Sequence, residues 1–573
     1  MRSRRNNKRR DDDKEKFEIK KTITEKQSKR NRREWRISLR KKRREGHIMK
    51  RRKLDPSEHV GKMFEIPPEF KGNLNAYMKY LKEELGKGQK RTLQATIKMR
   101  KMLAAADPPP PIKEIVSTGV VPALTHLFIQ NDDHRIKVEA AWCLCNITSL
   151  DTNEKVEFKG QMVSVSQRII ELIGEQSNGK FYDIALEQLV KESDNIEFVD
   201  NTMYLIGNVM GENSNCRDYF VSRNVIKITV KLLEQYQEEL RILVNGVAII
   251  ANSMRAKPKP KFEMIQPCLP LLQHLLHHPS SEVKEHVFWS YSYMSDWSQD
   301  FLWECLEKGI TKHLMTFLDS KNPKLISPAL RFVGSYTDLS DPLIEKIVDM
   351  ELPKHLSRLI HHSKKSIRKE SIWALSNLMA STTKVLEITF KTKVCDDFIA
   401  VSILEKLKKD SIVVKDQCVW FFGNTFGKAP KEALDYMIMK LRVIDVLFEE
   451  LKVNDKKYLD SLLRAINELL VRGKEISQKE GIQDKYKSMI QKTGKVERIV
   501  QLQNNADETI RNLSMKLIRD FFPEEETLMG DEDNGLYDNQ GGFGGNQGGG
   551  FGGMEEEPMT PMHNNNQTNY FDF

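Results

Sequence analysis

Cysteine is scarce in this chain of 573 residues, and long apolar runs are absent. The seven cysteines form no CxxC pair, and the two closest, Cys143 and Cys145, lie in an apolar segment typical of a helix. This pattern is typical of a reduced intracellular protein and excludes a disulfide framework. No stretch approaches the roughly 18 apolar residues that a membrane-spanning helix needs. The first residues, MRSRRNNKRRDDDK, contain no apolar segment, so we expect no secretory signal and no membrane partner.

The usual catalytic and metal-binding motifs are also missing. The sequence has no P-loop, no GxGxxG between a strand and a helix, no HExxH and no GxSxG. The 13 histidines are scattered, and the adjacent pairs His277–His278 and His361–His362 have a spacing that suits one metal ion on a helix poorly. We therefore expect a protein that is not an enzyme and that uses no metal and no cofactor.

The net charge of +10 is unevenly distributed. Residues 1–53 hold 25 Lys and Arg against 8 Asp and Glu (+17), residues 54–523 hold 66 against 62 (+4), and residues 524–573 hold none against 11 (−11). The acidic tail is rich in Gly and Asn, so we expect disorder from about Glu524 onward. A basic arm suggests nucleic acid or an acidic protein surface, whereas the near-neutral body argues against a nucleic-acid groove along the whole molecule.

A repeated helical pattern fills the body of the chain. A Trp-x-x-x-Asn element occurs as WCLCN, WALSN and WFFGN, with degenerate copies YLIGN, AIIAN, WSYSY and RFVGS. The last positions of the copies are 146, 208, 252, 293, 335, 377 and 424, so four of the six gaps lie within a few residues of 42. The gap of 62 predicts an insertion of about half a repeat within residues 150–180. Leu-rich segments with helical spacing, such as VVPALTHLF and CLPLLQHLL, lie between the copies, and the whole pattern predicts an all-α HEAT or armadillo superhelix.

The repeated Trp and Asn indicate a surface for extended basic peptides. Positions i and i+4 share one helix face, so each Trp projects beside its Asn. Asn amides can bond the backbone of a bound peptide, indoles can flank Lys and Arg side chains, and carboxylates can pair with the cationic tips. A single Trp on a helix is usually core packing, and a single Asn near a helix end is often a cap. Three full copies in phase with the repeat favour peptide binding, since packing by itself gives no reason for the Asn.

At EAAWCLCNI, PALRFVGSY, KESIWALSNL and DQCVWFFGN the chain resembles the repeats of the importin-α (karyopherin-α) family, the adaptors that bind nuclear localisation signals. The resemblance spans nearly the whole chain, because QKRTLQATIKMRKML with PPPPIKEIVSTG resembles the first repeat and GKVERIVQLQNNADETIRNLSMKLIRDFF the last. It implies a right-handed superhelical solenoid of about ten armadillo repeats over residues 89–523. A basic importin-β-binding domain would occupy residues 1–60, a linker and the start of the first repeat residues 61–88, and a disordered acidic tail residues 524–573.

The basic arm resembles the importin-β-binding domain of that family. Residues 29–53 read KRNRREWRISLRKKRREGHIMKRRK. The matching residues are Arg30, Arg32, Arg33, Leu39, Arg40, Lys41, Lys42, Arg43, Arg44, Lys50, Arg51 and Arg52. The resemblance implies that the arm binds importin-β and that, when unbound, residues 50–53 occupy the protein's own groove and inhibit it. The arm alone could also be a solvated charge run or a nucleic-acid tail, but beside the Trp and Asn array it favours importin-β, with no direct nucleic-acid contact.

The resemblance also implies two peptide-binding sites. The major site would comprise Trp142, Asn146, Tyr204, Asn208, Glu212 and Asn252, with Glu212 where the family usually has Asp. The minor site would comprise Arg331, Glu370, Trp373, Asn377, Trp420 and Asn424, and Trp289 and Tyr293 would lie between the two sites. Tyr204 and Ala248 replace two Trp residues of the major site, so we expect that site to bind more weakly and the minor site to contribute more.

The implied partners are importin-β, cargo proteins with basic nuclear localisation signals, the nuclear export receptor for importin-α and, indirectly, the nuclear pore complex. The implied location is both cytoplasmic and nuclear. Two alternatives stay open, a generic armadillo scaffold and a nucleic-acid-associated protein that uses the basic arm. The scaffold predicts basic groove residues in place of Trp and Asn, and the nucleic-acid protein predicts salt-dependent DNA retention that survives saturation with importin-β.

Overall fold

The computed structural model describes residues 67–70, 73–104, 112–148, 155–158, 161–176, 180–255, 257–394 and 397–524. Within these ranges the chain is helical apart from turns and two short hairpins. None of the helices in these ranges is both long and apolar enough to cross a membrane. The basic arm over residues 1–60 and the acidic tail beyond residue 524 lie outside the described residues.

A unit of three helices repeats along the body. In one such unit the short helices α10 (Ser214–Ser222) and α11 (Val225–Gln235) precede the longer α12 (Leu240–Met254). The first and second helices of the other units are α4 (Ile112–Ser117) and α5 (Val120–Gln130), α7 (Val165–Gln176) and α8 (Phe181–Lys191), α13 (Phe262–Ile265) and α14 (Leu269–Leu275), α16 (Gln299–Glu307) and α17 (Ile310–Thr316), α19 (Asp341–Asp349) and α20 (Leu352–Leu359), α22 (Thr383–Lys391) and α23 (Ile399–Lys409), α25 (Lys431–Asp435) and α26 (Val443–Glu450), and α28 (Lys485–Lys492) and α29 (Val496–Leu502).

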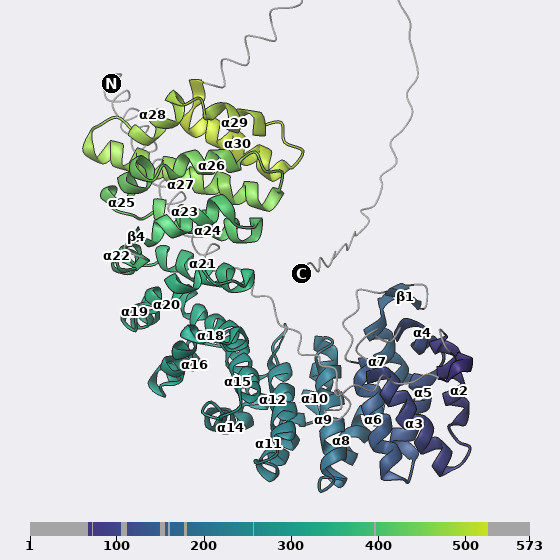
Figure 1. Ribbon diagram of the computed structural model, residues 1–573. Coiled ribbons are helices and arrows are strands. Elements are labelled where there is room, and N and C mark those ends of the chain that lie inside the picture. The colour runs from purple at the N-terminus through teal and green to yellow at the C-terminus, as the bar shows by residue number, and fades with distance from the viewer. Residues whose placement is uncertain are drawn as a thin grey trace, which may run out of the picture.

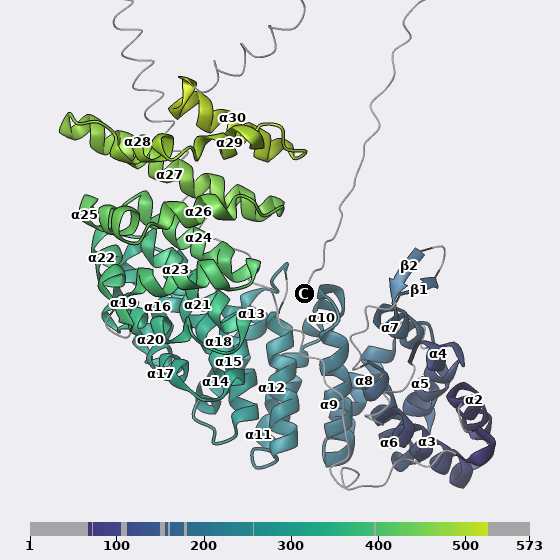
Figure 2. The same ribbon diagram turned by 45° about the horizontal axis from the view of Figure 1, so that its top comes forward.

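The third helices of successive units pack against one another along the body. Those among the described residues are α3 (Gln89–Ala104), α6 (His134–Thr148), α9 (Ile196–Met210), α12, α15 (Ser281–Met294), α18 (Pro323–Ser335), α21 (Lys365–Met379), α24 (Ile412–Phe426), α27 (Lys456–Glu480) and α30 (Glu508–Phe521). Figures 1 and 2 show the units following an arc from α2 (Leu74–Glu84) to α30, with α18, α21 and α24 toward its inner side and α16, α19 and α22 toward its outer side. The predicted all-α solenoid is therefore confirmed.

Short helical turns extend several helix ends. The 3₁₀ turns are η2 (Pro68–Phe70), η3 (Gln266–Cys268), η4 (Phe317–Asp319) and η5 (Tyr336–Asp338), and a π-helical turn, η6 (Tyr436–Lys440), follows α25. Because a 3₁₀ turn is tighter than an α-helix, it lets the chain reverse direction within a few residues.

In several units the turn between the first and second helix uses one left-handed residue. Gly119 and Gly309 have φ angles of 75° and 72°, and Asn224 has 59°. Glycine and asparagine suit this conformation, whereas Glu351 (64°) and Arg442 (55°) adopt it at a cost of roughly 1–2 kcal/mol each. The turn is therefore imposed by the packing of the two helices and not by residue type alone.

The predicted insertion within residues 150–180 contains a β-hairpin. Strand β1 (Lys155–Phe158) pairs antiparallel with β2 (Gln161–Ser164), with Val156 opposite Val163. The hairpin directly precedes α7, and Figure 2 shows it projecting beyond that helix. A second, shorter hairpin of β3 (Lys393–Val394) and β4 (Asp397–Phe398) joins α22 to α23. The extra residues behind the gap of 62 thus lie between two units, and the helical repeat continues after them.

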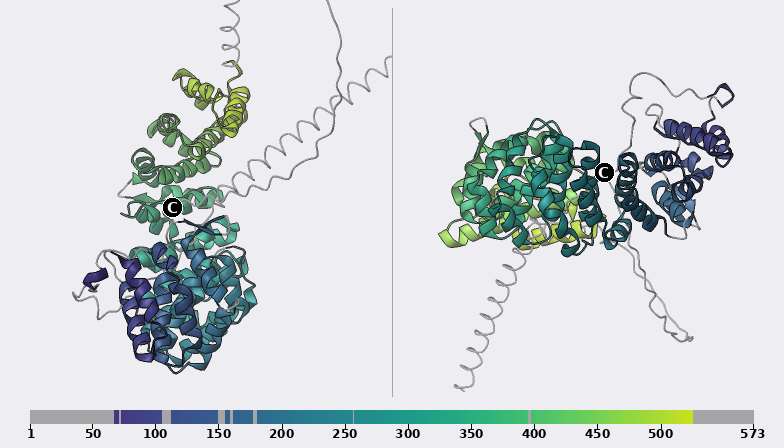
Figure 3. Two further views of the ribbon diagram at one scale, coloured as in Figure 1. Left: turned by 90° about the vertical axis from the view of Figure 1, so that its right-hand side faces the viewer. Right: turned by 90° about the horizontal axis from the view of Figure 1, so that it is seen from below.

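One continuous apolar core runs through the stacked units. Aromatic rings join neighbouring units in it, as where Phe128 of α5 stacks on Phe198 of α9 with their centroids 5.7 Å apart. Each unit buries its apolar faces only against its neighbours, so its stability depends on nearest-neighbour contacts. Figure 3 shows the resulting elongated stack from two further directions.

The cysteines among the described residues are free thiols, and most of them are buried in this core. Burial raises the pKa of Cys268 and of Cys305 to about 12, so neither thiol ionises near neutral pH. No disulfide joins the cysteines that the structure describes.

Candidate functional site

The predicted Trp-x-x-x-Asn elements and their degenerate copies all lie near the C-terminal ends of third helices, on α6, α9, α12, α15, α18, α21 and α24. Five of them end in Asn. These asparagines form a series that we call the asparagine ladder: Asn146, Asn208, Asn252, Asn377 and Asn424. Each is at most 2% exposed. The structure therefore places the ladder at one level of the stacked third helices, as the spacing predicted.

Four of the five ladder asparagines hydrogen-bond to the preceding unit, three of them directly to its backbone. In three of them Nδ2 donates to the carbonyl of the residue directly before the corresponding Asn of that unit. These bonds join Asn208 to Cys145 (3.2 Å), Asn252 to Gly207 (2.9 Å) and Asn424 to Ser376 (2.7 Å). Each amide thus bonds a carbonyl near the C-terminus of the neighbouring helix, where carbonyls often lack an intrahelical partner, although the carbonyl of Gly207 also accepts from the N–H of Gly211 at 3.0 Å.

The fourth bond passes through a hydroxyl group. The preceding unit has Ser335 in place of the ladder Asn, and there Nδ2 of Asn377 donates to Oγ1 of Thr337 at 3.1 Å. That hydroxyl in turn donates to the carbonyl of Gly334 at 2.6 Å, which is the residue directly before Ser335. Thr337 thus bridges the same two positions that a direct bond joins elsewhere.

These bonds correct the expectation that packing gives no reason for the repeated Asn. The amide of each bonded asparagine holds two units together, which is a structural role. An Asn amide also carries a second N–H and a carbonyl oxygen. In Asn377 and Asn424 the buried Oδ1 accepts no hydrogen bond from any described residue. Each of these two side chains thus bonds the preceding unit through its amide N–H, while its carbonyl oxygen is buried.

An arginine of the chain itself stacks on Trp142 of the predicted major site. The Arg100 guanidinium lies 4.3 Å from the ring centroid, and Nε of Arg100 donates to Oε2 of Glu139 at 2.6 Å. Arg100 is 6% exposed, while Trp142 is half-buried. This indole therefore already takes part in a cation–π contact, the type of interaction that we predicted for a bound Lys or Arg.

In the next two units, the side chains at the Trp positions of the predicted major site are smaller than Trp. Tyr204 on α9 is 8% exposed, and Ala248 on α12 is 2% exposed. Glu212 is half-buried and follows Gly211, the residue that ends α9. The carboxylate thus lies beyond the helix end, one helical turn after Asn208 in sequence.

Two tryptophans of the predicted minor site are held in different ways. Trp373 is 4% exposed and packs on Gly334, where an added Cβ would lie 3.0 Å from its Cζ3 atom. Trp420 is half-buried and donates from Nε1 to Oδ1 of Asp416 at 3.0 Å. Glu370 is half-buried on α21, three residues before Trp373, and forms no ion pair with any described residue.

The predicted residues between the sites form a contact with the minor site. Trp289 and Tyr293 stack on each other along α15 with their centroids 5.6 Å apart. The Arg331 guanidinium of α18 lies 5.7 Å from the Trp289 ring centroid. Arg331, which we assigned to the minor site, therefore contacts Trp289, one of the residues between the two sites.

Sequence reasoning missed three charged residues at these levels. Arg100 and Asp416 contact the predicted tryptophans Trp142 and Trp420. Glu468 on α27 comes 44 residues after Asn424 and is only 2% exposed. Continuing the repeat spacing by one step would have found Glu468, which places a carboxylate where the ladder would have its next Asn.

Within the described part of the chain, no group of three or more His, Cys, Asp or Glu side chains is arranged to hold a metal ion.

Comparisons with known proteins agree with the repeat. The family model described as Armadillo/beta-catenin-like repeat matches residues 108–149 and 340–380. Importin subunit alpha-1a of Oryza sativa subsp. japonica is 30% identical over 352 residues, which are 60% of this chain and 61% of that protein. Importin subunit alpha-1b of the same plant is 31% identical over 49% of each chain. The chain thus matches about half to three fifths of the length of these two relatives.

A longer match is found with another plant protein. Importin subunit alpha-3 of Arabidopsis thaliana is 27% identical over 476 residues, which are 81% of this chain and 82% of that protein. Among solved structures, the crystal structure of an engineered protein from the Northeast Structural Genomics Consortium aligns with a TM-score of 0.59 at 17% identity. The alignment covers 78% of this chain and 98% of the engineered one, and it supports the fold alone.

Proposed function

We propose that the chain is a divergent member of the importin-α family and that it acts as a non-enzymatic adaptor for nuclear import. Its ligands are cargo proteins that carry basic nuclear localisation signals. The observation that carries the proposal is the asparagine ladder, which lies near the C-terminal ends of the stacked third helices beside the repeated tryptophans.

The ladder binds an extended peptide irrespective of its side chains. The ladder asparagines offer amide groups to the peptide backbone, and in Asn208, Asn252, Asn377 and Asn424 one N–H stays on the neighbouring unit. The side chains of the peptide then lie between the tryptophans, where Lys and Arg contribute both aliphatic contact and cation–π attraction. Half-buried carboxylates near the two sites, Glu212 and Glu370, receive the cationic tips. The result is selectivity for basic segments.

The basic arm connects cargo binding to transport. Residues 29–53 bind importin-β, and in its absence residues 50–53 occupy the ladder as an internal competitor. A segment tethered to its own site competes at an effective concentration set by the linker, so it excludes weak cargo without any further contact. The adaptor then shuttles between cytoplasm and nucleus, returns with the export receptor for importin-α, and contacts the nuclear pore complex only through its carriers.

The two peptide sites contribute unequally. Tyr204 and Ala248 give the major site less aromatic surface than Trp373 and Trp420 give the minor site, and stacking on Tyr is weaker than stacking on Trp. We therefore expect a short basic peptide to depend more on Trp373 than on Trp142.

A binding assay tests these statements together. A fluorescein-labelled basic peptide is titrated with the full-length chain and with a chain that lacks residues 1–60, in the presence and absence of importin-β. We expect tighter peptide binding after removal of the arm or addition of importin-β, and weaker binding by Trp373→Ala than by Trp142→Ala. A peptide with its Lys and Arg replaced by Ala is the control. If the full-length chain fails to bind importin-β, the adaptor function is wrong, and if only Trp142→Ala abolishes peptide binding, the site ranking is wrong.

A further inference from the structure

A polar pocket of about 500 Å³ lies where two neighbouring units meet, away from the asparagine ladder. One wall is the turn from α20 into α21, and the other is the turn from α23 into α24. Both walls are at the N-terminal ends of third helices, whereas the ladder is near their C-terminal ends. Arg368 and Asn377 are nine residues apart on α21, which corresponds to about 13 Å along the helix axis. The pocket is thus a separate site.

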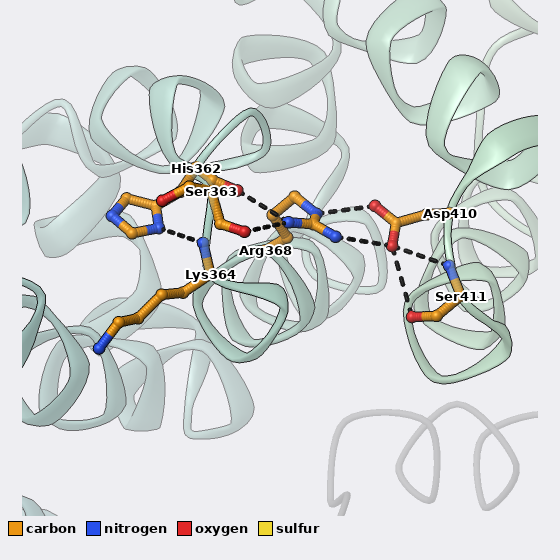
Figure 4. Close-up of polar contacts among 6 residues, drawn as sticks. All are labelled: His362, Ser363, Lys364, Arg368, Asp410 and Ser411. Atoms are coloured by element: carbon orange, nitrogen blue, oxygen red, sulfur yellow. Dashed lines mark hydrogen bonds and ion pairs between the residues drawn. The ribbon is translucent and has the colours of Figure 1, made fainter.

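An arginine–aspartate pair lies in the lining of the pocket and ties the two turns together. Arg368 donates from Nε and from one terminal nitrogen to the two oxygens of Asp410, at 2.7 and 2.9 Å. Its other terminal nitrogen donates to the carbonyls of His362 and Ser363, at 2.9 and 2.8 Å. Figure 4 shows the guanidinium held between these carbonyls and the carboxylate. Asp410 also accepts from the backbone N–H of Ser411 at 2.8 Å, so the charges of this pair are neutralised and their positions set.

The remaining cations of the pocket have no such partner. Lys365, Lys406 and Lys409 line it, and none of them forms an ion pair with any described residue. Glu405 is the other carboxylate in the lining, so the pocket carries four cations against two anions. Like charges around one small space repel each other, and an anion in the pocket relieves that repulsion.

Two histidines line the pocket, and burial is the main influence on the pKa of each. Burial and the charge of Lys406 lower the pKa of His361, and burial and the charge of Lys364 lower that of His362. In His362 the Nδ1 atom accepts from the backbone N–H of Lys364 at 2.9 Å. The hydrogen of the neutral ring is therefore on Nε2.

Two helix N-termini add to the positive field of the pocket. Helices α21 and α24 are both 15 residues long, and neither Lys364 nor Ser411 makes a side-chain capping bond at their starts. The first N–H groups of a helix carry partial positive charge and favour anions. Lysines supply the compact charges that suit a phosphoryl oxygen. We propose that this pocket binds a phosphoryl group.

The phosphoryl group can come from a phosphorylated side chain or from a small free polyphosphate. Ile412 and Val413, the two residues after Ser411, are 41% and 45% exposed. Exposed apolar residues next to a cationic pocket suit a phosphoserine or phosphothreonine with an apolar neighbour, because a free ion gains nothing from them. The phosphorylated side chain is therefore the source that the surface favours.

The test uses the full-length chain at constant ionic strength. Pyrophosphate is titrated into it by calorimetry, and a fluorescent phosphoserine peptide with one flanking Leu is titrated in parallel with its unphosphorylated form. Lys409→Gln removes a pocket cation, while Lys408→Gln removes an exposed charge from the adjacent position of α23 outside the pocket. We expect Lys409→Gln to weaken phosphoryl binding by roughly tenfold and Lys408→Gln to leave it within about twofold.

The outcomes separate the sources and the explanations. If the phosphopeptide binds and pyrophosphate displaces it, the source is a phosphorylated side chain. If pyrophosphate binds and the phosphopeptide does not, the source is a free polyphosphate. Equal weakening by both variants would show a diffuse surface charge and would overturn the proposal, as would the absence of saturable binding by either ligand. Unchanged circular dichroism and urea midpoints of both variants verify that they are folded.

Discussion

Replacing Asn424 by alanine should destabilise the contact of its helix with the preceding unit more than Asn377→Ala destabilises the corresponding contact of α21. Asn424 donates directly to the carbonyl of Ser376 at 2.7 Å, and both residues are 1% exposed. Asn377 donates instead to the hydroxyl of Thr337, which keeps its own bond to the carbonyl of Gly334. The two variants therefore remove the same side chain but leave different groups behind.

The magnitudes follow from what each change leaves unpaired. Asn377→Ala removes one hydrogen bond, worth about 1 kcal/mol net, because the carbonyl behind the hydroxyl stays bonded. Asn424→Ala removes such a bond and also leaves the buried carbonyl of Ser376 without its donor, which adds about 1 kcal/mol or more. The lost volume is the same in both variants, so it cancels in the comparison. We expect about 2 kcal/mol for Asn424→Ala, a factor of about 30 in the local equilibrium, against a factor of about 5 for Asn377→Ala.

Native-state hydrogen exchange measures this difference locally. Repeat arrays open unit by unit, so peptides covering α21 and α24 report the affected contact, and those covering α9 serve as an internal control. Urea unfolding followed by circular dichroism gives the global value. If Asn377→Ala accelerates exchange as much as Asn424→Ala, or if Asn424→Ala changes it by less than about twofold, the asparagines do not hold the units together as described.

Two further predictions concern other contacts between units. Asp410→Asn should cost roughly 2 kcal/mol at neutral pH, because it removes the charged acceptor of Arg368. Burial favours the neutral acid, but the bonds from Arg368 and from the following backbone N–H hold the pKa of Asp410 below its ordinary value. The stability from this pair is therefore full above about pH 4 and is lost as the pH falls through the lowered pKa. Urea midpoints measured between pH 6 and 2.5 should fall less steeply for Asp410→Asn than for the unchanged protein, and parallel curves would contradict the assignment. Gly334→Ala should displace the indole of Trp373, since its Cβ would lie 3.0 Å from that ring, and should destabilise the protein by about 1 kcal/mol after the gain in helix propensity. Gly207→Ala is the matched control in an equivalent position, where the nearest side-chain atom is 3.6 Å away, and thermal unfolding should show it neutral or stabilising.

Much of the fold could be predicted because its signals are local. The Trp-x-x-x-Asn elements recur at helical spacing, and the structure places every copy on a third helix. The insertion could be located from a gap in the repeat, although its hairpin could not be predicted. The left-handed turns at Glu351 and Arg442 were also beyond prediction, because those residue types disfavour the conformation and the packing of neighbouring helices imposes it.

The candidate site was predictable in position but not in its bonding. Sequence placed Asn208 and Asn424 on a shared level, yet their partners Cys145 and Ser376 are 63 and 48 residues away in the chain. Arg100, which stacks on Trp142, lies in the preceding unit and has no motif of its own. Such pairs depend on how far one unit is rotated against the next, which no local pattern specifies.

The sequence by itself determined the helical repeat, the segregation of charge into an arm, a body and a tail, and the positions of the Trp and Asn residues. These properties depend on side-chain spacing within one helix or on composition, and both can be counted along the chain. Only the tertiary structure decided that the asparagine amides cap the preceding unit and that Lys365 and Lys409 line one pocket. Those contacts join residues of different units, and they form only when apolar burial sets the geometry of stacking.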